Sequence, residues 1–137
     1  MLTKQHGGER VRDVMTAQPS TAPESITVTD FLVHYVMSAH RSAFPIVDPS
    51  GRVTGLVTLG RCIGVPAEAR DTTPLSEIAW QPSELTIAHP DEELAGVLTR
   101  ARGGDGRVLV YSGDDLVGIV TPSDVARTVQ RSGPVSH

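Results

Sequence analysis

The hydrophobic pattern of the chain occurs twice. Residues 44–58 (FPIVDPSGRVTGLVT) align without a gap on residues 107–121 (RVLVYSGDDLVGIVT). Each stretch has an apolar strand, a turn rich in Gly, Ser and Asp, and a second apolar strand that ends in Thr, which is the pattern of a β-hairpin. The similarity extends upstream, where residues 11–19 correspond to residues 75–82. We therefore expect two copies of one supersecondary unit.

A helix is expected between the first strand and the hairpin of each copy. In the first copy, apolar residues recur at i, i+3, i+4, i+7 and i+8, which places on one helical face Val28, Phe31, Leu32, Tyr35 and Val36. In the second copy, Pro90 and the acids after it indicate a helix start, and the apolar stripe that follows comprises Leu94, Val97, Leu98 and Ala101. Each copy thus has the order strand, helix, strand, strand, helix.

The two closing helices are expected to differ in length. The segment after Thr121 begins with Pro122 and continues through Arg131, whereas the segment after Thr58 contains two glycines and stops at Pro66. Because glycine and proline disfavour helix interiors, the first closing helix is predicted to be short.

The repeat sets the expected organisation of the chain. We expect an N-terminal linker (1–10), a first repeat (11–65), a linker (66–73), a second repeat (74–131) and a flexible tail (132–137). The chain has 137 residues, and two half-units of about 60 residues would each be marginally stable alone. The halves are therefore expected to bury their apolar faces against each other. The predicted fold class is α+β.

Composition excludes several classes of protein. Hydrophobic residues make up 39% of the chain and charged residues 20%, as in a soluble globular protein, and no apolar run approaches a membrane span. A net charge of −4 with dispersed Lys and Arg provides no basic stripe for nucleic acid. The single cysteine, Cys62, excludes an internal disulfide, and no secretory segment precedes the folded part. A cytoplasmic location is therefore expected.

The repeated order of elements carries a resemblance to a known family. With a start like residues 11–16 (VRDVMT) and an end like residues 118–124 (GIVTPSD), the chain resembles a tandem pair of cystathionine-beta-synthase (CBS) domains, or Bateman module, over about residues 11–131. The resemblance implies two β-α-β-β-α repeats that pack by their sheets about a pseudo-two-fold axis. It also implies clefts between the repeats that hold AMP, ADP, ATP or S-adenosylmethionine. Residues 42–48, 55–58 and 118–125 are similar to the pair appended to bacterial site-2-type intramembrane zinc proteases.

The end of the second repeat is the candidate ligand site. Gly118 allows a ligand or a neighbouring backbone to approach closely, and Thr121 stands where a strand gives way to a helix whose first amides favour a phosphate. Asp124 can accept two hydrogen bonds from a ribose diol. The resemblance assigns Thr121 to phosphate and Asp124 to ribose. The expected site residues are Gly118, Thr121, Ser123 and Asp124, together with Leu85, Arg107 and Val108, which topology alone places near the adenine.

The same residues also fit a plain helix cap. Thr121 suits the N-cap, Pro122 the first helical position, and Asp124 the position that bonds back to the N-cap amide. Both interpretations remain open from sequence. In the first repeat, Arg61 stands where the acid is expected, and an arginine cannot accept a bond from a diol. Arg61 can still contact a phosphate, and we expect the first cleft to be empty.

Other chemistry is not indicated. The five histidines have no metal-binding spacing with Cys62, which is expected to be a small buried residue. Trp80 is expected to cover the edge of a sheet, with stacking on a purine as the alternative. The sequence contains no nucleophile with a base, no metal set and no Gly-rich phosphate loop, so the chain is not expected to be an enzyme itself.

Two functions remain. The first is a regulatory module that senses an adenosyl ligand and modulates an attached or partner protein, for which a membrane protease is a candidate. The second is a structural dimerisation module without nucleotide. A homodimer is expected, because the apolar helix faces, which include Val125 and Val129, exceed what one chain can cover. No nucleic-acid partner and no direct membrane insertion are expected, and the cytoplasmic face of a membrane protein is a possible location.

Overall fold

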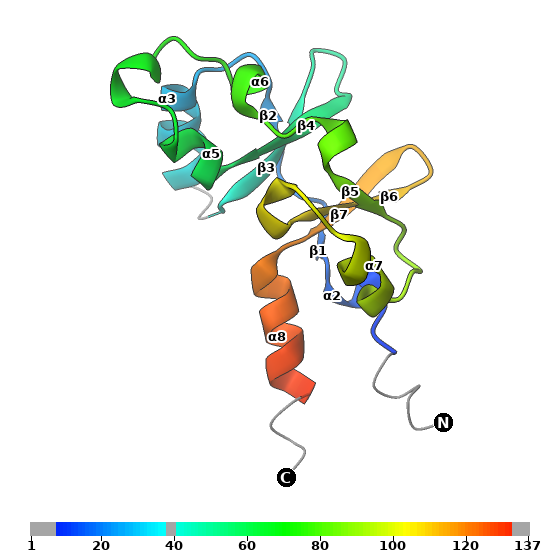
Figure 1. Ribbon diagram of the computed structural model, residues 1–137. Coiled ribbons are helices and arrows are strands. Elements are labelled where there is room, and N and C mark those ends of the chain that lie inside the picture. Colours follow the sequence, from blue (N-terminus) through cyan, green and yellow to red (C-terminus); the bar gives the residue numbers. More distant parts are fainter. Residues whose placement is uncertain (1–7, 38–40, 133–137) are drawn as a thin grey trace. The chain divides into compact units, whose positions relative to one another are not determined.

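The chain forms two compact units. The computed structural model describes residues 8–37 and 41–132, with side chains up to residue 128. Unit 1 combines Met1–Pro19 with Leu85–His137, and unit 2 is Ser20–Glu84. Figure 1 shows the strands and helices of both. No helix of the described segments is long and apolar enough to cross a membrane.

Unit 2 contains a three-stranded sheet in the order β2-β3-β4. Strand β2 (Ala22–Pro23) runs parallel to β3 (Ala43–Val47), which pairs antiparallel with β4 (Val53–Thr58). The turn of this hairpin is closed by Asp48, whose Oδ1 accepts from the backbone N–H groups of Ser50 and Arg52, each at 3.0 Å. The first predicted hairpin is thus confirmed.

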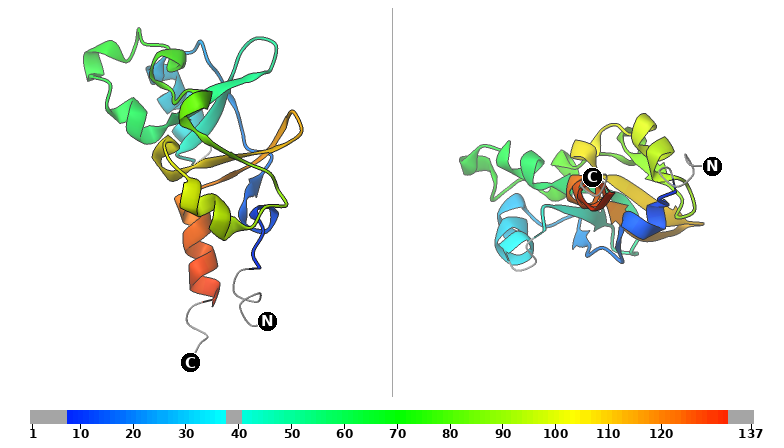
Figure 2. Two further views of the ribbon diagram at one scale, coloured as in Figure 1. Left: turned by 45° about the vertical axis from the view of Figure 1, so that its right-hand side comes forward. Right: turned by 90° about the horizontal axis from the view of Figure 1, so that it is seen from below.

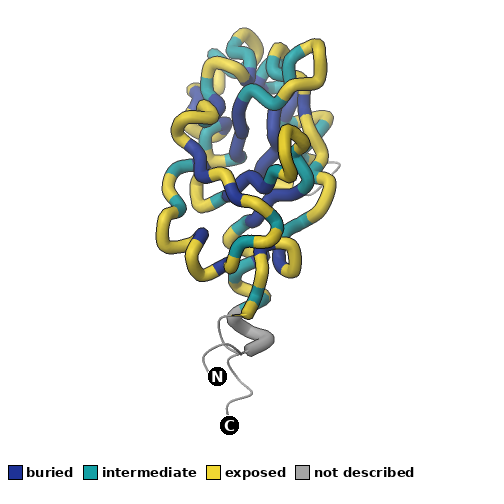
Figure 3. Tube along the Cα trace, turned by 90° about the vertical axis from the view of Figure 1, so that its right-hand side faces the viewer, coloured by how far each residue is buried: buried dark blue, intermediate teal, exposed yellow. Residues whose placement is uncertain are grey.

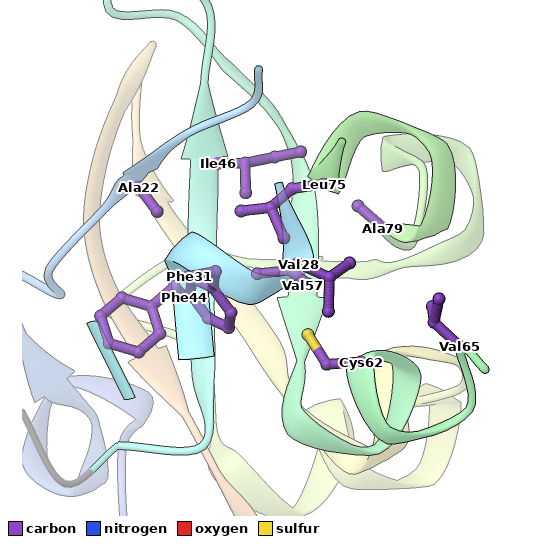
Figure 4. Close-up of a cluster of buried hydrophobic side chains, with 10 residues drawn as sticks. All are labelled: Ala22, Val28, Phe31, Phe44, Ile46, Val57, Cys62, Val65, Leu75 and Ala79. Carbon is purple, nitrogen blue, oxygen red and sulfur yellow. The ribbon is translucent and has the colours of Figure 1, made fainter. Parts of the chain in front are cut away.

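Helices cover the apolar face of this sheet. The predicted first helix is present as α3 (Val28–Phe31), continued by the π-helical turn η1 (Leu32–Val36). Phe31 meets Phe44 of β3 edge to face, with 5.1 Å between ring centroids. The closing helix α5 (Leu59–Ile63) has five residues, as short as predicted. Figure 4 shows the core of unit 2, formed by Ala22, Val28, Phe31, Phe44, Ile46, Val57, Cys62, Val65, Leu75 and Ala79.

The segment between the repeats is bound into unit 2. It contains the short turn η2 (Ala67–Ala69) and leads to α6 (Leu75–Ile78) and η3 (Pro82–Glu84). The backbone N–H groups of Val28 and Thr29 donate to the carbonyls of Thr73 and Arg70, at 2.9 and 3.1 Å. The Arg70 guanidinium donates to carbonyl oxygens at the C-terminal end of α5, at 2.8 and 3.1 Å. These bonds fasten the segment to two helices of the unit.

Unit 1 contains a four-stranded sheet in the order β1-β7-β6-β5. The strands are β1 (Thr16–Ala17), β5 (Thr86–Ala88), β6 (Val108–Ser112) and β7 (Asp115–Val120). The helices are α2 (Val11–Val14), α7 (Leu94–Arg100), the turn η4 (Gly104–Gly106) and α8 (Pro122–Ser132), which continues from the end of β7 (Figure 2). Figure 3 colours the trace by how far each residue is buried. The core comprises Val11, Val14, Ala88, Leu94, Val97, Val108, Val110 and Val120.

The helix α7 differs from the prediction in its start and in its apolar stripe. It begins at Leu94 rather than at Pro90, because the Glu92 carboxylate accepts from the His89 N–H at 2.8 Å and closes a turn before the helix. Arg100 donates to the same carboxylate at 2.9 and 3.3 Å, which lowers the pKa of Glu92. Leu98 is 37% exposed and does not belong to the buried stripe. The packing of α2 also delays the start of α7, because the Val11 N–H donates to the Glu92 carbonyl oxygen at 2.9 Å.

Each unit contains the leading segment of the other repeat, where the leading segments are residues 11–17 and 75–80. Thr16 pairs antiparallel with Ile119 of β7. Trp80 forms an isolated antiparallel bridge with Leu56 of β4. The compact units therefore do not coincide with the sequence repeats 11–65 and 74–131, whose boundaries, like the packing about a pseudo-two-fold axis, remain predictions.

A glycine permits each of these close approaches. A Cβ atom on Gly55 would lie 2.6 Å from the Trp80 carbonyl oxygen. A Cβ atom on the equivalent Gly118 would overlap the Sδ atom of Met15. The hairpin strands therefore require a residue without a side chain where the leading segment crosses them.

Gly55→Ala is expected to destabilise the protein by about 1–3 kcal/mol, because the added methyl group forces the Trp80 backbone to move. Gly118→Ala should cost less, because the flexible Met15 side chain can turn aside. Gly96→Ala in α7 is the control, since nothing lies within 4 Å of its added Cβ, and it should stabilise by about 0.4–1 kcal/mol. Urea unfolding measures all three, and equal effects of Gly55→Ala and Gly96→Ala would contradict the close-approach explanation.

Candidate functional site

Four predicted site residues lie at one end of the sheet in unit 1. Val108 of β6 lies in register with Val120 of β7 and with Thr86 of β5. The neighbouring residues at that end are Leu85, Arg107 and Thr121. Leu85 and Val108 are buried, and Thr121 is half-buried. The register thus brings together residues that sequence reasoning had placed near an adenine and a phosphate on separate grounds.

Asp124 and Thr121 form a complete capping box at the start of α8. The Asp124 Oδ2 accepts from the Thr121 N–H at 2.9 Å and from the Thr121 hydroxyl at 3.0 Å. In return, the Asp124 N–H donates to the Thr121 Oγ1 at 3.2 Å. The capping interpretation, which the sequence left open, therefore accounts for these bonds without a ligand.

The Asp124 carboxylate has further partners. Its side chain is only 2% exposed, and its Oδ1 pairs with the Arg127 guanidinium. The Thr16 hydroxyl of β1 donates to both oxygens, at 3.3 and 3.4 Å. A ribose diol can bind this carboxylate only in exchange for a donor that is already present. Thr16 makes the longest of the side-chain contacts, so it is the most readily displaced.

The structure places Gly118 inside β7 and Ser123 in the first turn of α8. The space above Gly118 is taken by Met15, so this glycine serves the crossing of the leading segment. Ser123 lies exposed on the first turn of α8. The structure does not bring Gly118 to the sheet end where Arg107 and Thr121 meet, because it lies inside β7.

Sequence reasoning missed a loop beside this sheet end. Residues 103–106 all have positive φ, at 72°, 58°, 53° and 86°. The loop turns immediately before Arg107, whose Nη1 donates to the Asp105 carbonyl at 2.9 Å. A Cβ atom on Gly106 would lie 3.2 Å from the Pro122 Cγ, so the loop lies against the start of α8. The signal was the sequence GGDG, since three glycines permit a left-handed run.

Unit 2 has a different pair at the equivalent place. Trp80 occupies the position of Thr16, and Arg61 that of Asp124. The Arg61 Cζ lies 3.8 Å from the centroid of the Trp80 ring. The Trp80 backbone bridges to Leu56 of β4, the edge strand of the sheet, while the role expected for its indole stays a prediction.

The other residues considered for chemistry are Cys62 and the possible metal ligands. Cys62 is fully buried, and its burial raises the pKa of the thiol to about 11, against a smaller opposing effect of the Arg70 charge. Such a thiol is protonated at neutral pH and unreactive. Among the residues that the structure describes, no group of three His, Cys, Asp or Glu side chains is placed to hold a metal ion.

Residues 11–68 match the family described as CBS domain. The chain is 45% identical over 124 residues to the putative zinc metalloprotease Rip3 of Mycobacterium tuberculosis, from strains Erdman and H37Rv. This match covers 89% of the chain and 32% of the relative, so the chain spans about a third of the length of the curated relatives it matches.

Solved structures share the fold. One is the CBS domain pair of protein MJ0100 in complex with 5′-methylthioadenosine and S-adenosyl-L-methionine, at 25% identity and a TM-score of 0.71. That match covers 88% of this chain and 98% of the other. Another is a CBS domain-containing protein of unknown function from Bacillus anthracis, at 14% identity and a TM-score of 0.75, covering 95% and 99%. The second likeness concerns the fold alone.

Asp124→Asn is expected to destabilise the protein by about 1.5–3 kcal/mol. The hydrogen bonds to a buried charged group are lost, and the new amide NH2 group faces a side chain that is itself a donor. Asp114→Asn, at the exposed hairpin turn, is the control and should stay within about 0.5 kcal/mol of the parent. Urea unfolding measures both. A loss of about 1 kcal/mol or less for Asp124→Asn would be that of a cap alone, and would contradict a contribution from Thr16 and Arg127.

Proposed function

The chain is a CBS domain pair, and on that premise we propose that it is a regulatory module that senses an adenosyl ligand. The proposed ligands are AMP, ADP, ATP and S-adenosylmethionine. Ligand binding then modulates an attached or partner protein. The observation that carries the proposal is the convergence of Leu85, Arg107 and Thr121 at one sheet end, with Asp124 in the first turn of α8. The complex of the MJ0100 pair with two adenosyl compounds supports the class of ligand.

Each residue has a proposed role at this sheet end. The adenine is proposed to lie beside Leu85 and the β6 backbone at Val108, whose own side chain is buried in the core of unit 1, and the Asp124 carboxylate accepts from the ribose hydroxyls. The Arg107 guanidinium meets a phosphate, or the carboxylate of S-adenosylmethionine. The Thr121 hydroxyl and Ser123, at the start of α8, bind the same anionic part.

The leading segment offers a route by which the ligand acts on the rest of the protein. A ribose hydroxyl that bonds Asp124 replaces the Thr16 hydroxyl, whose contacts measure 3.3 and 3.4 Å. Thr16 belongs to a two-residue strand, β1, which follows directly from α2. The ligand therefore favours a state in which β1 is held less firmly, and this difference between the two states is what regulation requires.

The proposed attached protein is a membrane-bound zinc metalloprotease. The curated relatives are described as putative zinc metalloproteases, and the chain covers 32% of their length. The membrane location is inferred from the resemblance of residues 42–48, 55–58 and 118–125 to the pair of intramembrane proteases. In this proposal the chain is the regulatory part without catalytic residues, located on the cytoplasmic face of the membrane. The alternative function, a structural dimerisation module without nucleotide, has support from apolar side chains on the surface of unit 2, where Val33, Met37 and Ile63 are 52–70% exposed.

Ligand binding is expected to stabilise the protein. A ligand present at a hundredfold its dissociation constant adds about 2.7 kcal/mol, so the melting temperature should rise by several degrees.

Calorimetric titration should show that the affinity of Asp124→Asn for the ligand is weakened about tenfold or more, because two charge-assisted bonds to the diol are lost. Arg61→Ala is the control, with affinity close to that of the parent.

Two outcomes would contradict the ligand proposal in different ways. If millimolar AMP, ADP, ATP and S-adenosylmethionine all leave the melting temperature unchanged, the structural dimerisation module is favoured. If a ligand binds Asp124→Asn and the parent equally well, the carboxylate is a helix cap and takes no part in ribose recognition.

A homodimer remains a prediction. Val125 packs partly against the core of unit 1, and the side chain of Val129 lies outside the described residues. Light scattering at tens of micromolar is expected to give about twice the 14.6 kDa of one chain, because the exposed apolar side chains favour self-association. A monomer mass under these conditions would contradict the prediction.

A further inference from the structure

The internal repeat supplies a counterpart for each polar residue of the proposed site. The aligned sequences place Arg61 opposite Asp124 and Phe44 opposite Arg107. The aligned leading segments place Trp80 opposite Thr16. The backbone register agrees, since Trp80 bridges to Leu56 as Thr16 pairs with Ile119. The same geometrical position can therefore be compared in both units.

Arg61 and Trp80 close this position in unit 2. The guanidinium lies against the indole, with Cζ 3.8 Å from the ring centroid. Arg61 Nε and Trp80 Nε1 are both buried, and within the described part of the chain neither has a hydrogen-bond partner. The Arg61 N–H also donates to the Thr58 Oγ1 at 3.3 Å, which fixes the start of α5. A ligand can reach these nitrogens only after the two planar groups have separated.

The position closed by Arg61 and Trp80 also differs from the proposed site in unit 1 in its hydrogen-bonding groups and charge. Where Asp124 offers two acceptors to a diol, Arg61 and Trp80 have only donors in their side chains. Where Arg107 offers a cation to an anionic group, Phe44 is 1% exposed and packs against Phe31 in the core. Both polar functions of the proposed site are thus missing from the first repeat.

We propose that the first repeat is closed by its own Arg61–Trp80 pair, so that the chain takes one adenosyl ligand, through the second repeat. The number of ligands rests on the proposed function. The closure of the first repeat does not, because it follows from the stacking and burial of two side chains. The sequence predicts that the first cleft is empty. The structure instead has this position filled by the side chains of Arg61 and Trp80.

Trp80 is the only tryptophan of the chain, so its fluorescence reports directly on the pair. Acrylamide quenching is measured for the parent, Arg61→Ala and Arg61→Met. In both variants the quenching constant should rise about twofold or more and the emission should shift to the red, because the guanidinium no longer covers the ring face. Arg61→Met keeps an apolar stem of similar length and guards against loss of fold, which far-UV circular dichroism checks. Arg52→Ala, at the exposed β3–β4 turn, is the matched control and should behave as the parent.

Stoichiometry is measured separately by calorimetric titration of the full chain with AMP and with S-adenosylmethionine. One equivalent per chain is expected, with Trp80 quenching unchanged at saturation. Two equivalents in the parent would overturn the closure, as would equal quenching constants in the parent and in folded Arg61→Ala and Arg61→Met. If neither compound binds, ADP and ATP are titrated in the same way, and failure of all four overturns the proposed function. The quenching experiment still decides whether the pair is closed.

Discussion

Backbone hydrogen bonds between each leading segment and the hairpin of the other repeat are the constraint on which both units depend. Leu56 and Trp80 exchange two such bonds, at 3.0 and 2.8 Å. The bonds form only because a glycine precedes the bridging residue of the hairpin and leaves room for a second backbone. The fold therefore fixes which side chain stands beside the end of each hairpin. It places Thr16 near Asp124 and Trp80 near Arg61.

The fold and the proposed ligand recognition depend on the same side chains at these two places. A buried carboxylate needs partners, and Asp124 finds them in Thr16, Thr121 and Arg127. The bonds that the proposed ligand must replace therefore reduce the affinity expected for a ribose. In unit 2 the equivalent side chains serve only the fold, because an arginine stacked on an indole has no hydrogen-bond acceptor for a ribose hydroxyl.

The local parts of this structure could be predicted, and the long-range contacts could not. Alternating and helical hydrophobic periods give both hairpins and the face of α3, because those patterns depend on near neighbours. The start of α7 was misplaced, since it depends on bonds from Val11 and Arg12, about 80 residues earlier in the chain. The Thr16–Asp124 contact joins residues 108 positions apart. A signal for the stacked pair was nevertheless present, because the aligned repeats differ at both partner positions, with Trp80 for Thr16 and Arg61 for Asp124.

The exchange of leading segments also bears on how such a chain originates. A single repeat cut out as residues 11–65 would hold a leading segment with no β7 to pair with, and a strand β4 without the Trp80 bridge. Two identical copies can satisfy each other by swapping these segments. Gene duplication and fusion turn that bimolecular exchange into an intramolecular one at high effective concentration. Once fused, the copies are free to diverge, so one can keep a carboxylate for a ligand while the other fills the same place with an arginine and an indole.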